Sequence, residues 1–416
     1  MRDEIRERIE AVRRGEVPEG YVVENHQLRP VEWGYDRIGE HLIAYDEYSN
    51  DTERYPLATS SRQGLMLQTD YYGDQRYDET TGGFHVVPEG YITYRHMSDD
   101  DVFKFNMNIM GTPVLVSPEY PVFTTDGNLD KTILVEYLNG MKEFRAFCSA
   151  QKKGSTRTRM YFNRLGEFSM PIPPVAEQRR IAKILDVCDR GLKLKQKLII
   201  EKQKQKQWLV SQILRGGHRR LLCGICPFIC DGDWIESKDQ SDAGIRLIQT
   251  GNVGLGKFRD KENRAKFITE ETFDRLHCTE VLAGDVLVSR LPDPIGRACI
   301  VPAMGVKAIT AVDCTILRFN DDNLARYFVH YTTSREYLDK VEALSGGSTR
   351  SRISRKEIEK LTIPIPDSIE QIIEINNRLT VADKEIELLE KEVEAQYRLK
   401  KTLMQLLLTG LVRVNA

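Results

Sequence analysis

Residues 154–178 read GSTRTRMYFNRLGEFSMPIPPVAEQ, and residues 347–371 read GSTRSRISRKEIEKLTIPIPDSIEQ. The two stretches align without a gap at an offset of 193 residues, and they share the start G-S-T-R, the sequence P-I-P and the ending E-Q. A repeat of this kind indicates that one structural unit occurs twice in the chain. The rest of the sequence can therefore be divided around the two copies.

A long stretch nearly free of Gly and Pro follows each copy, at residues 177–216 and 369–409. These stretches predict two long helices, for which Pro174 suits the start and Gly216 and Gly410 suit the ends. With one residue inserted, the offset becomes 194 and the repeat continues to both helix ends. The matching residues there are Lys206, Leu209, Leu214 and Gly216 in the first copy and Lys400, Leu403, Leu408 and Gly410 in the second.

Apolar residues recur along both stretches at alternating steps of three and four, which predicts that each helix buries one stripe against another helix. The stripe of the second helix consists of Ile372, Ile375, Leu379, Ala382, Ile386, Leu389, Val393, Leu403 and Leu407. The weaker stripe of the first consists of Ile181, Leu185, Cys188, Leu192, Ile199, Leu209 and Ile213. The residues that interrupt the stripes are Lys195, Lys202 and Lys206 in the first and Gln396 and Lys400 in the second.

The charges of the two helices are complementary. The first stretch carries eleven Lys/Arg and four Asp/Glu, whereas the second carries six and eight. If the helices run antiparallel, three lysines face three glutamates and help to set the register. These residues are Lys193, Lys195 and Lys197 on one side and Glu390, Glu392 and Glu394 on the other.

The segments ahead of each helix have short apolar runs interrupted by Gly, Pro, Asn and Asp. We expect strands in GTPVLVSP (111–118), KTILVEYL (131–138), GIRLIQTGNV (244–253), GDVLVSR (284–290) and RACIVP (297–302). The predicted fold class is α+β: two β-rich globular domains separated by two long antiparallel coiled-coil helices, with a pseudo-two-fold internal repeat. The predicted segments are an N-terminal helix and turn (1–30), a first lobe (31–173), a first long helix (174–216), a second lobe (217–366) and a second long helix (367–416).

The overall composition limits the function classes. The net charge is only −2, so a surface for nucleic acid must be a local patch or be shared with a partner. No apolar run reaches the roughly 18 to 20 residues of a membrane helix, and the N-terminal MRDEIRERIEAVRRGE lacks the apolar core of a signal peptide. Eight cysteines in 416 residues are too few for a disulfide framework. We expect a cytoplasmic protein with reduced cysteines and no membrane contact.

Three motifs come close to catalytic or metal-binding patterns. GNVGLGKF (251–258) lacks the Ser or Thr that would bind magnesium in a phosphate loop, so we predict a turn. LCGICPFIC (222–230) has no second C-x-x-C, and its alternation favours a strand over a zinc site. Glu236-Ser237-Lys238 has the E-x-K spacing of some nucleases without the preceding Pro-Asp. We therefore predict a chain that is not an enzyme, with no metal and no cofactor of its own.

The repeated hexapeptides GSTRTR (154–159) and GSTRSR (347–352) combine hydroxyl groups, a glycine that exposes backbone N–H groups and two arginines. These groups suit contacts with the phosphates and base edges of DNA. A single turn of this kind is usually only solvated. Two copies at equivalent places in an otherwise divergent repeat favour a binding role.

The arrangement resembles the specificity subunit of Type I restriction–modification systems. The resemblance is carried by the two G-S-T-R turns, by P-I-P…E-Q at 171–178 and 364–371, and by the helix ends SQILRG and QLLLTG. EVPEGY near the N-terminus and GIRLIQTGNV, GDVLVSR and GRACIVP in the second lobe match as well. It covers nearly the whole chain, although the first lobe matches only in outline.

The resemblance implies that each lobe is a target recognition domain that reads one half of a split, asymmetric sequence in double-stranded DNA. The long helices would set the gap between the half-sites and dock two methyltransferase subunits, and restriction subunits would complete the complex. S-adenosylmethionine, ATP and Mg would be bound by those partners. This chain would then direct DNA methylation and restriction without catalysing either.

Side chains that contact DNA are expected in the two hexapeptides and in further polar loops, because Arg, Asn and Gln can form paired hydrogen bonds with base edges. The candidates are Ser155, Thr156, Arg157, Arg159, Ser348, Thr349, Arg350, Arg352, Arg62, Gln63, Arg246, Gln249, Asn252, Arg290 and Arg297. For each of them, the alternative is a contact that only stabilises a loop.

Two other functions are compatible with parts of the pattern. A two-lobed coiled-coil scaffold that binds proteins without DNA specificity accounts for the helices but not for the duplicated basic turns. A fragment of a fused nuclease–methyltransferase would give the cysteine cluster or the E-x-K spacing a role, and metal analysis of the purified protein would test it.

Overall fold

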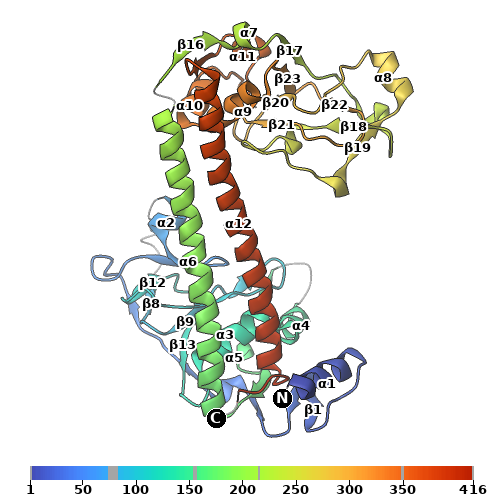
Figure 1. Ribbon diagram of the computed structural model, residues 1–416. Coiled ribbons are helices and arrows are strands. Elements are labelled where there is room, and N and C mark those ends of the chain that lie inside the picture. The colour runs from blue at the N-terminus through green and yellow to red at the C-terminus, as the bar shows by residue number, and fades with distance from the viewer. Residues whose placement is uncertain (1, 74–82, 153–156, 214–215, 348–350, 415–416) are drawn as a thin grey trace. The chain divides into compact units, whose positions relative to one another are not determined.

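The computed structural model describes residues 2–73, 83–152, 157–213, 216–347 and 351–414 (Figure 1). Contacts divide the chain into two compact units. Unit 1 consists of Met1–Lys195 and Glu392–Ala416, and unit 2 consists of Gln196–Lys391. The unit boundaries fall inside the two long helices, so each unit contains one lobe and a part of both helices.

Unit 1 is built from small antiparallel sheets and short helices. One sheet has the order β11-β9-β13-β4 and another the order β12-β8-β5. Their strands are β4 (Leu42–Ala44), β5 (Tyr48–Ser49), β8 (Phe84–Val87), β9 (Ile92–Tyr94), β11 (Phe105–Met107), β12 (Val114–Val116) and β13 (Val122–Thr125). The two-stranded ladders are β1 (Tyr21–Glu24) with β2 (Gln27–Pro30), β3 (Gly34–Arg37) with β15 (Ser169–Ile172), β6 (Ala58–Ser61) with β7 (Gly64–Leu67), and β10 (Met97–Ser98) with β14 (Thr158–Arg159). The helices of this lobe are α1 (Arg2–Arg13), α2 (Gln68–Tyr72), α3 (Lys131–Gly140), α4 (Lys142–Ala150) and α5 (Phe162–Leu165), with a 3-10 turn η1 (Ile38–Glu40).

Unit 2 has its own sheets, with the orders β17-β23-β20-β21, β19-β18-β22 and β16-β24. Within them, β18 and β22 pair in parallel and the other pairs are antiparallel. The strands are β16 (His218–Leu221), β17 (Phe228–Asp231), β18 (Ile245–Ile248), β19 (Lys266–Ile268), β20 (Val286–Ser289), β21 (Ala298–Ile300), β22 (Ala308–Thr310), β23 (Cys314–Arg318) and β24 (Thr362–Ile365). The helices are α7 (Leu222–Ile225), α8 (Glu270–Leu276), α9 (Asp322–Tyr331), α10 (Arg335–Ala343) and α11 (Arg355–Glu359), with 3-10 turns η2 (Ser237–Asp239), η3 (Thr250–Asn252) and η4 (Glu262–Arg264).

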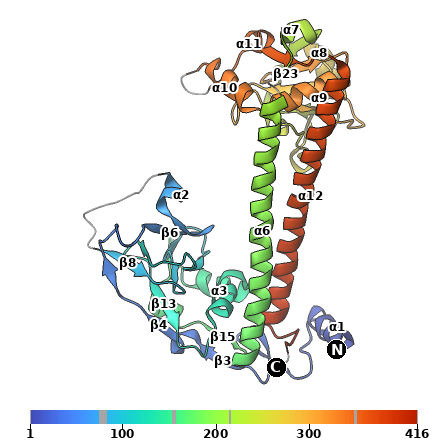
Figure 2. The same cartoon turned by 60° about the vertical axis from the view of Figure 1, so that its left-hand side comes forward.

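The two long helices are α6 (Val175–Ile213) and α12 (Ile369–Leu408). They lie side by side in Figures 1 and 2, and ion pairs show that they run antiparallel. In unit 1 the pairs are Lys195–Glu392 at 2.6 Å and Asp189–Lys400 at 2.7 Å. In unit 2 they are Lys202–Glu385 at 2.7 Å and Lys206–Asp383 at 2.6 Å. The predicted antiparallel pairing and the Lys195–Glu392 contact are therefore confirmed.

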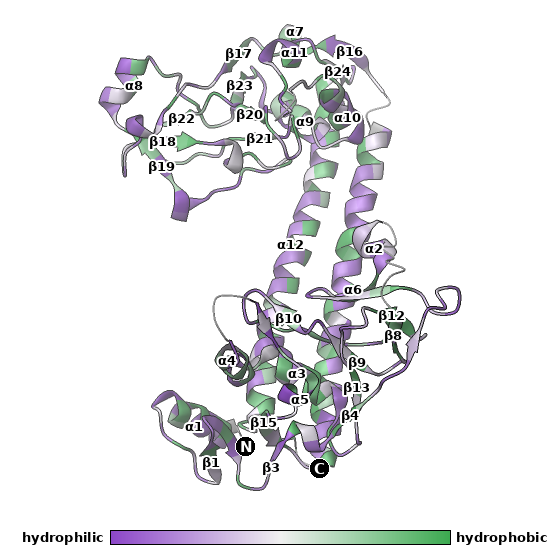
Figure 3. Cartoon of the chain, turned by 180° about the vertical axis from the view of Figure 1, so that it is seen from behind, coloured by the Kyte–Doolittle hydropathy of each residue, from purple (hydrophilic) through white to green (hydrophobic). Residues whose placement is uncertain are grey.

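Burial along these helices follows the predicted stripes, and apolar and polar residues alternate along both helices in Figure 3. Buried stripe residues include Ile181, Leu185 and Leu192 on α6 and Ile372, Leu379 and Leu407 on α12. The lysines that interrupt the stripes, Lys195, Lys202, Lys206 and Lys400, are the residues that form the interhelical ion pairs. Their apolar stems can cover the stripe while their ammonium groups are paired.

Each lobe shares a hydrophobic core with the adjoining parts of the long helices. In unit 1, buried residues of β9, β11, β13, α3 and α4 form one cluster with Ile181 and Leu185 of α6 and Leu407 of α12. In unit 2, residues of β20, α9 and α10 cluster with Val210 of α6 and Ile372 of α12. The helices are therefore part of both cores.

One predicted strand is wrong, because KTILVEYL (131–138) lies in helix α3. The Asp130 side chain accepts hydrogen bonds from the backbone N–H groups of Thr132 and Ile133 at 2.8 and 3.2 Å and caps the helix. Its buried residues are Ile133, Leu134, Tyr137 and Leu138. Their helical spacing buries one face, which outweighs the strand preference of the β-branched residues. The other four predicted runs contain strands β12, β18, β20 and β21.

The structural repeat is longer than the sequence repeat. Helices α4 (Lys142–Ala150) and α10 (Arg335–Ala343) begin and end 193 residues apart, as do strands β15 and β24. Each strand pairs with a strand that opens its lobe, β15 with β3 and β24 with β16. The helices share little sequence, KEFRAFCSA against REYLDKVEA, so only their positions reveal that they correspond.

Candidate nucleic-acid interface

The first hexapeptide lies beside an acidic loop in unit 1. Residues 153–156, and with them Ser155 and Thr156, lie outside the described part of the chain. Arg157 donates from Nε to Asp99 at 2.7 Å, and both side chains are exposed. Thr158 forms a hydrogen bond with Asp101, and β14 pairs with β10 immediately before this loop. Arg159 is exposed and donates to the hydroxyl of Tyr161 at 3.4 Å.

Arg62 and Gln63 form the exposed turn between β6 and β7. Arg62 pairs with Asp100 of the same acidic loop, and this hydrogen bond lowers the pKa of the Asp100 carboxyl. Arg62 and Arg157 are far apart in sequence, but the fold brings both of them to one loop. There they pair with the consecutive residues Asp100 and Asp99. Exposed ion pairs of this type contribute little to stability, so phosphate oxygens can replace the carboxylates.

A cavity of about 610 Å³ opens next to this loop. Its lining residues include Arg62, Gln63, Tyr71, Arg95, Asp100 and Lys104. Burial lowers the pKa of Lys104. We did not expect Arg95, Lys104 or the acidic residues from sequence, although the run SDDD at 98–101 is a visible signal of a charged loop. The cavity combines donors, acceptors and an aromatic ring, the groups with which proteins contact nucleotides.

In unit 2, Arg352 of the second hexapeptide lies close to Arg290. Arg352 pairs with Asp313 at 3.0 Å, and the Arg290 backbone N–H donates to the carbonyl of Asp313 at 2.9 Å. The Arg290 guanidinium is buried and pairs with Asp231 at 3.2 Å. Ser348, Thr349 and Arg350 lie outside the described residues. Arg352 is thus the accessible member of this pair.

Arg297 is enclosed by the fold. This residue is 7% exposed. Its guanidinium donates four hydrogen bonds to backbone carbonyls, with donor–acceptor distances between 2.7 and 3.0 Å. The acceptors are Val253, Leu291, Pro294 and Thr250. Since an arginine has five N–H groups, almost all of its donors are used. These hydrogen bonds give Arg297 a structural role in the fold, and DNA contact at this residue stays a prediction.

Asn252 has a similar structural role. It is buried, its Oδ1 accepts from the backbone N–H of Gln249 at 3.0 Å, and its Nδ2 donates to the carbonyl of Arg259 at 2.9 Å. The oxygen and the nitrogen of its side-chain amide therefore both have partners within the chain, and DNA contact at Asn252 stays a prediction. Gln249 is half-buried. Arg246 is buried and pairs with the exposed Asp260 at 3.2 Å, so only the end of its side chain is near solvent.

The motifs that resembled phosphate-binding and zinc sites are parts of ordinary secondary structure and turns. Within GNVGLGKF, Val253 and Phe258 form a β-bridge, and Gly254 donates to the carbonyl of Lys257 at 2.9 Å. In LCGICPFIC, residues 222–225 form α7 and only the last part is a strand, β17. Over the described ranges, no group of three or more His, Cys, Asp and Glu side chains is arranged to hold a metal ion. The same ranges contain no helix with the length and hydropathy needed to cross a membrane.

Comparison with known proteins agrees with the repeat. The family model "Type I restriction modification DNA specificity domain" matches residues 86–202 and 226–396, more than half of the chain, once in each copy. The Type I restriction enzyme MjaVIII specificity subunit of Methanocaldococcus jannaschii is 24% identical over 94% of this chain and 96% of its own length. The putative MjaX specificity subunit of the same organism is 26% identical over 68% of each chain.

Solved structures have the same fold. The S subunit of a Type I restriction–modification system from M. genitalium has a TM-score of 0.56 at 13% identity, covering 91% of this chain and 96% of that one. A chain from a study of complex assembly and conformational transition of the Type I system has a TM-score of 0.55 at 16% identity, covering 92% and 99%. With two matched domains, a full-length curated relative and a shared fold, this chain belongs to the specificity-subunit family of Type I restriction–modification systems.

Proposed function

We propose that this chain is the non-catalytic subunit that reads a bipartite, asymmetric DNA site and brings methyltransferase and restriction subunits to it. The observation that carries the proposal is the presence of accessible arginines at equivalent places in two unlike lobes. Arg159 and Arg352 are separated by the repeat offset of 193 residues and are exposed. Unlike lobes around equivalent basic turns suit two different half-sites.

The proposed DNA-contacting side chains are those on accessible turns. In unit 1 they are Arg62, Gln63, Arg157 and Arg159, and in unit 2 they are Arg352 and the end of Arg246. Ser155, Thr156, Ser348, Thr349 and Arg350 belong to the same two turns in sequence. Arg and Gln on such turns can contact phosphates or read base edges.

The long helices suit the proposed docking of two methyltransferase subunits. Both carry exposed large apolar side chains outside the stripes that pack the helices together. On α6 these are Val187, Leu194, Leu198, Ile200 and Trp208, and on α12 they are Val381, Leu388, Tyr397 and Leu399. Exposed apolar surface of this kind is typical of protein interfaces. Because α6 and α12 each contribute to both units, their length can set the gap between half-sites.

In this proposal the partner subunits bind S-adenosylmethionine, ATP and Mg, and the complex acts on DNA in the cytoplasm. Co-expression with the methyltransferase encoded beside it, followed by long-read mapping of methylated adenines, tests the proposal. We expect one split motif with a fixed gap that is absent when this chain is omitted. Methylation that is missing, or that appears without this chain, would leave the alternative of a protein-binding scaffold.

A further inference from the structure

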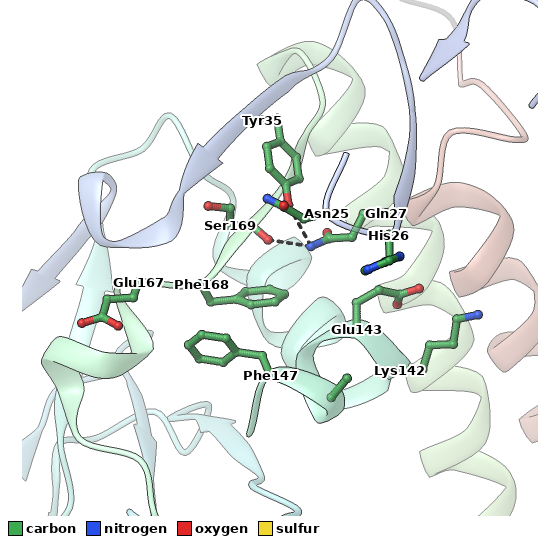
Figure 4. A pocket seen from close by; sticks show the side chains of 11 residues that line it. Asn25, His26, Gln27, Tyr35, Lys142, Glu143, Phe147, Glu167, Phe168 and Ser169 are labelled. Atoms are coloured by element: carbon green, nitrogen blue, oxygen red, sulfur yellow. Dashed lines mark hydrogen bonds between the residues drawn. The ribbon is translucent and has the colours of Figure 1, made fainter. Parts of the chain in front are cut away.

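A second cavity of unit 1, of about 640 Å³, lies between the β1–β2 hairpin, β3 and the start of α4. Figure 4 shows its lining, with the Phe147 and Phe168 rings close together and the Glu143 side chain beside His26. The two ring centroids are 5.2 Å apart. The cavity therefore combines a carboxylate, the Lys142 ammonium and two aromatic rings, of which the half-buried Phe147 is more accessible than Phe168, which is 4% exposed.

The Glu143 carboxylate is incompletely satisfied. Its Oε2 atom is buried and accepts no hydrogen bond from the residues that the structure describes. A buried acceptor without a donor destabilises a fold, and such an atom in a native structure calls for an explanation, for example a bound water, an ion or a group of a ligand. A donor from another molecule would remove that cost.

The internal repeat indicates which donor suits this position. Glu143 and Glu336 are both the second residue of their helices, α4 and α10, and lie 193 residues apart. In unit 2, Glu336 pairs with Nη2 of Arg219 at 2.7 Å, and both line a cavity of about 810 Å³. The carboxylate at this place in the repeat thus binds a guanidinium group in unit 2.

In unit 1 a tyrosine stands where unit 2 has that arginine. The strand register pairs Tyr35 with Pro171 and Arg219 with Pro364, and these two prolines are themselves equivalent in the sequence repeat. The Tyr35 hydroxyl accepts a hydrogen bond from Gln27 at 3.1 Å. Tyr35 therefore has a partner of its own, and no guanidinium from this chain reaches Glu143 among the described residues.

A buried tyrosine in each unit is affected by the carboxylate of that unit. Burial raises the pKa of Tyr137, and the charge of Glu143 and the neighbouring Tyr35 raise it further. Burial raises the pKa of Tyr331 to about 12, where Glu336 adds to the shift and Arg219 opposes it.

We propose that this cavity binds an arginine side chain of the methyltransferase subunit, whose guanidinium pairs with Glu143 and stacks on the Phe147 ring. The identity of the partner rests on the proposed function. The chemistry rests on the unpaired carboxylate oxygen, the aromatic rings and the Arg219–Glu336 pair of the other unit. Arginine suits such a site because its planar group pairs with carboxylates and stacks on rings.

The first test compares the affinity of full-length variants for the purified methyltransferase. Glu143→Gln keeps the shape of the side chain and removes its charge, and we expect a loss of about tenfold or more in affinity. Glu167→Gln is the matched control, because that exposed carboxylate lines the same cavity but is already paired with Arg164 at 2.5 Å. We expect it to bind like the unaltered chain.

The second test supplies the arginine within the chain. Tyr35→Arg should raise the midpoint of thermal unfolding by a few degrees and should weaken methyltransferase binding, because the new guanidinium occupies the cavity. The gain in midpoint should vanish in the double variant Tyr35→Arg/Glu143→Gln. This measurement needs no partner and tests the chemistry of the cavity alone.

The outcomes separate this proposal from the proposed function. Unchanged methyltransferase affinity of Glu143→Gln, or the same thermal shift with and without Glu143, would overturn the arginine site while leaving the specificity-subunit role intact. A loss of DNA affinity with unchanged methyltransferase affinity would also overturn it. If the unaltered chain does not bind the methyltransferase, the partner itself is wrong and both proposals fail.

Discussion

At the scale of single residues, the structure separates arginines that hold the fold from arginines that can meet a ligand. All the candidate arginines were equivalent in sequence, since each lies in a polar loop with a side chain able to contact bases. Burial and hydrogen bonds distinguish them, and both depend on segments distant in sequence. Arg297 donates hydrogen bonds to backbone carbonyls of two different loops, whereas the Arg159 side chain is exposed. Such differences cannot be read from local sequence.

Arg297→Met is expected to destabilise unit 2 by about 3 kcal/mol or more, because several buried carbonyls lose charged donors at once. The free energy of unfolding in urea measures this effect. The exposed Arg264→Met is the matched control, and we expect a change within about 0.5 kcal/mol. If Arg297→Met is as stable as the control and alters the methylated motif, Arg297 reads DNA after all.

His330 is expected to make unit 2 sensitive to acid. Burial lowers the pKa of His330 to about 4 against the attraction of Asp383, and Lys206 and Arg326 lower it further. The unfolded chain binds a proton at this residue as the pH falls below about 6.5, whereas the folded chain does so only near 4. The stabilising effect of neutral His330 is therefore complete above about pH 6.5 and is lost as the pH falls toward 4.

The shift corresponds to at most about 3 kcal/mol between pH 7 and pH 4. Urea unfolding of the unaltered chain and of His330→Gln over this range measures the effect. We expect a weaker loss of stability in the variant as the pH falls. Identical pH dependence in the two proteins would show that other groups dominate acid unfolding.

At the scale of elements, the long helices were predictable because their signals are local. The absence of Gly and Pro, the three- and four-residue spacing and the complementary charges all act within a few turns. Helix α3 was predicted to be a strand because its β-branched residues favour strands. The Asp130 cap and the burial of one helical face stabilise the helix instead. The strand pairings were not predictable, since each joins segments far apart in the chain. The correspondence of α4 and α10 was hidden because their side chains have diverged.

The repeat also places equivalent charges between the helices. Lys400 lies between Asp189 at 2.7 Å and Glu136 at 2.9 Å, and its repeat partner Lys206 pairs with Asp383 at 2.6 Å. Asp189 and Asp383 are themselves 194 residues apart. Burial alone would lower the pKa of Lys400, but hydrogen bonds to the two carboxylates outweigh it and raise the pKa.

Lys400→Met is expected to destabilise unit 1 by about 3 to 5 kcal/mol, because Glu136 and Asp189 lose the ammonium group that hydrogen-bonds to both carboxylates. Lys391→Met removes an exposed lysine from the same helix, where Lys391 pairs with the exposed Glu387, and should cost less than about 1 kcal/mol. Urea unfolding of both variants gives the comparison. Equal, small effects would mean that the buried cluster contributes no more than a surface pair.

At the scale of the whole molecule, the sequence repeat predicted two equivalent units, and the family comparison agrees with it. The sequences of the two lobes have diverged, and in the proposed function this difference lets each lobe read a different half-site. The two ladders β3–β15 and β16–β24 open and close the lobes in the same way. Exchanging one lobe for a copy of the other at these ladders should therefore preserve the local structure at both joins.

The most direct measurement is the methylated motif of a chain in which residues 218–365 are replaced by a second copy of residues 34–172, co-expressed with the methyltransferase. The account predicts that the asymmetric split motif becomes symmetric, with the word read by the first lobe repeated in opposite orientations on the two sides of the gap. An unchanged asymmetric motif, in a chain that still assembles with the methyltransferase, would contradict the claim that each lobe reads its own half-site.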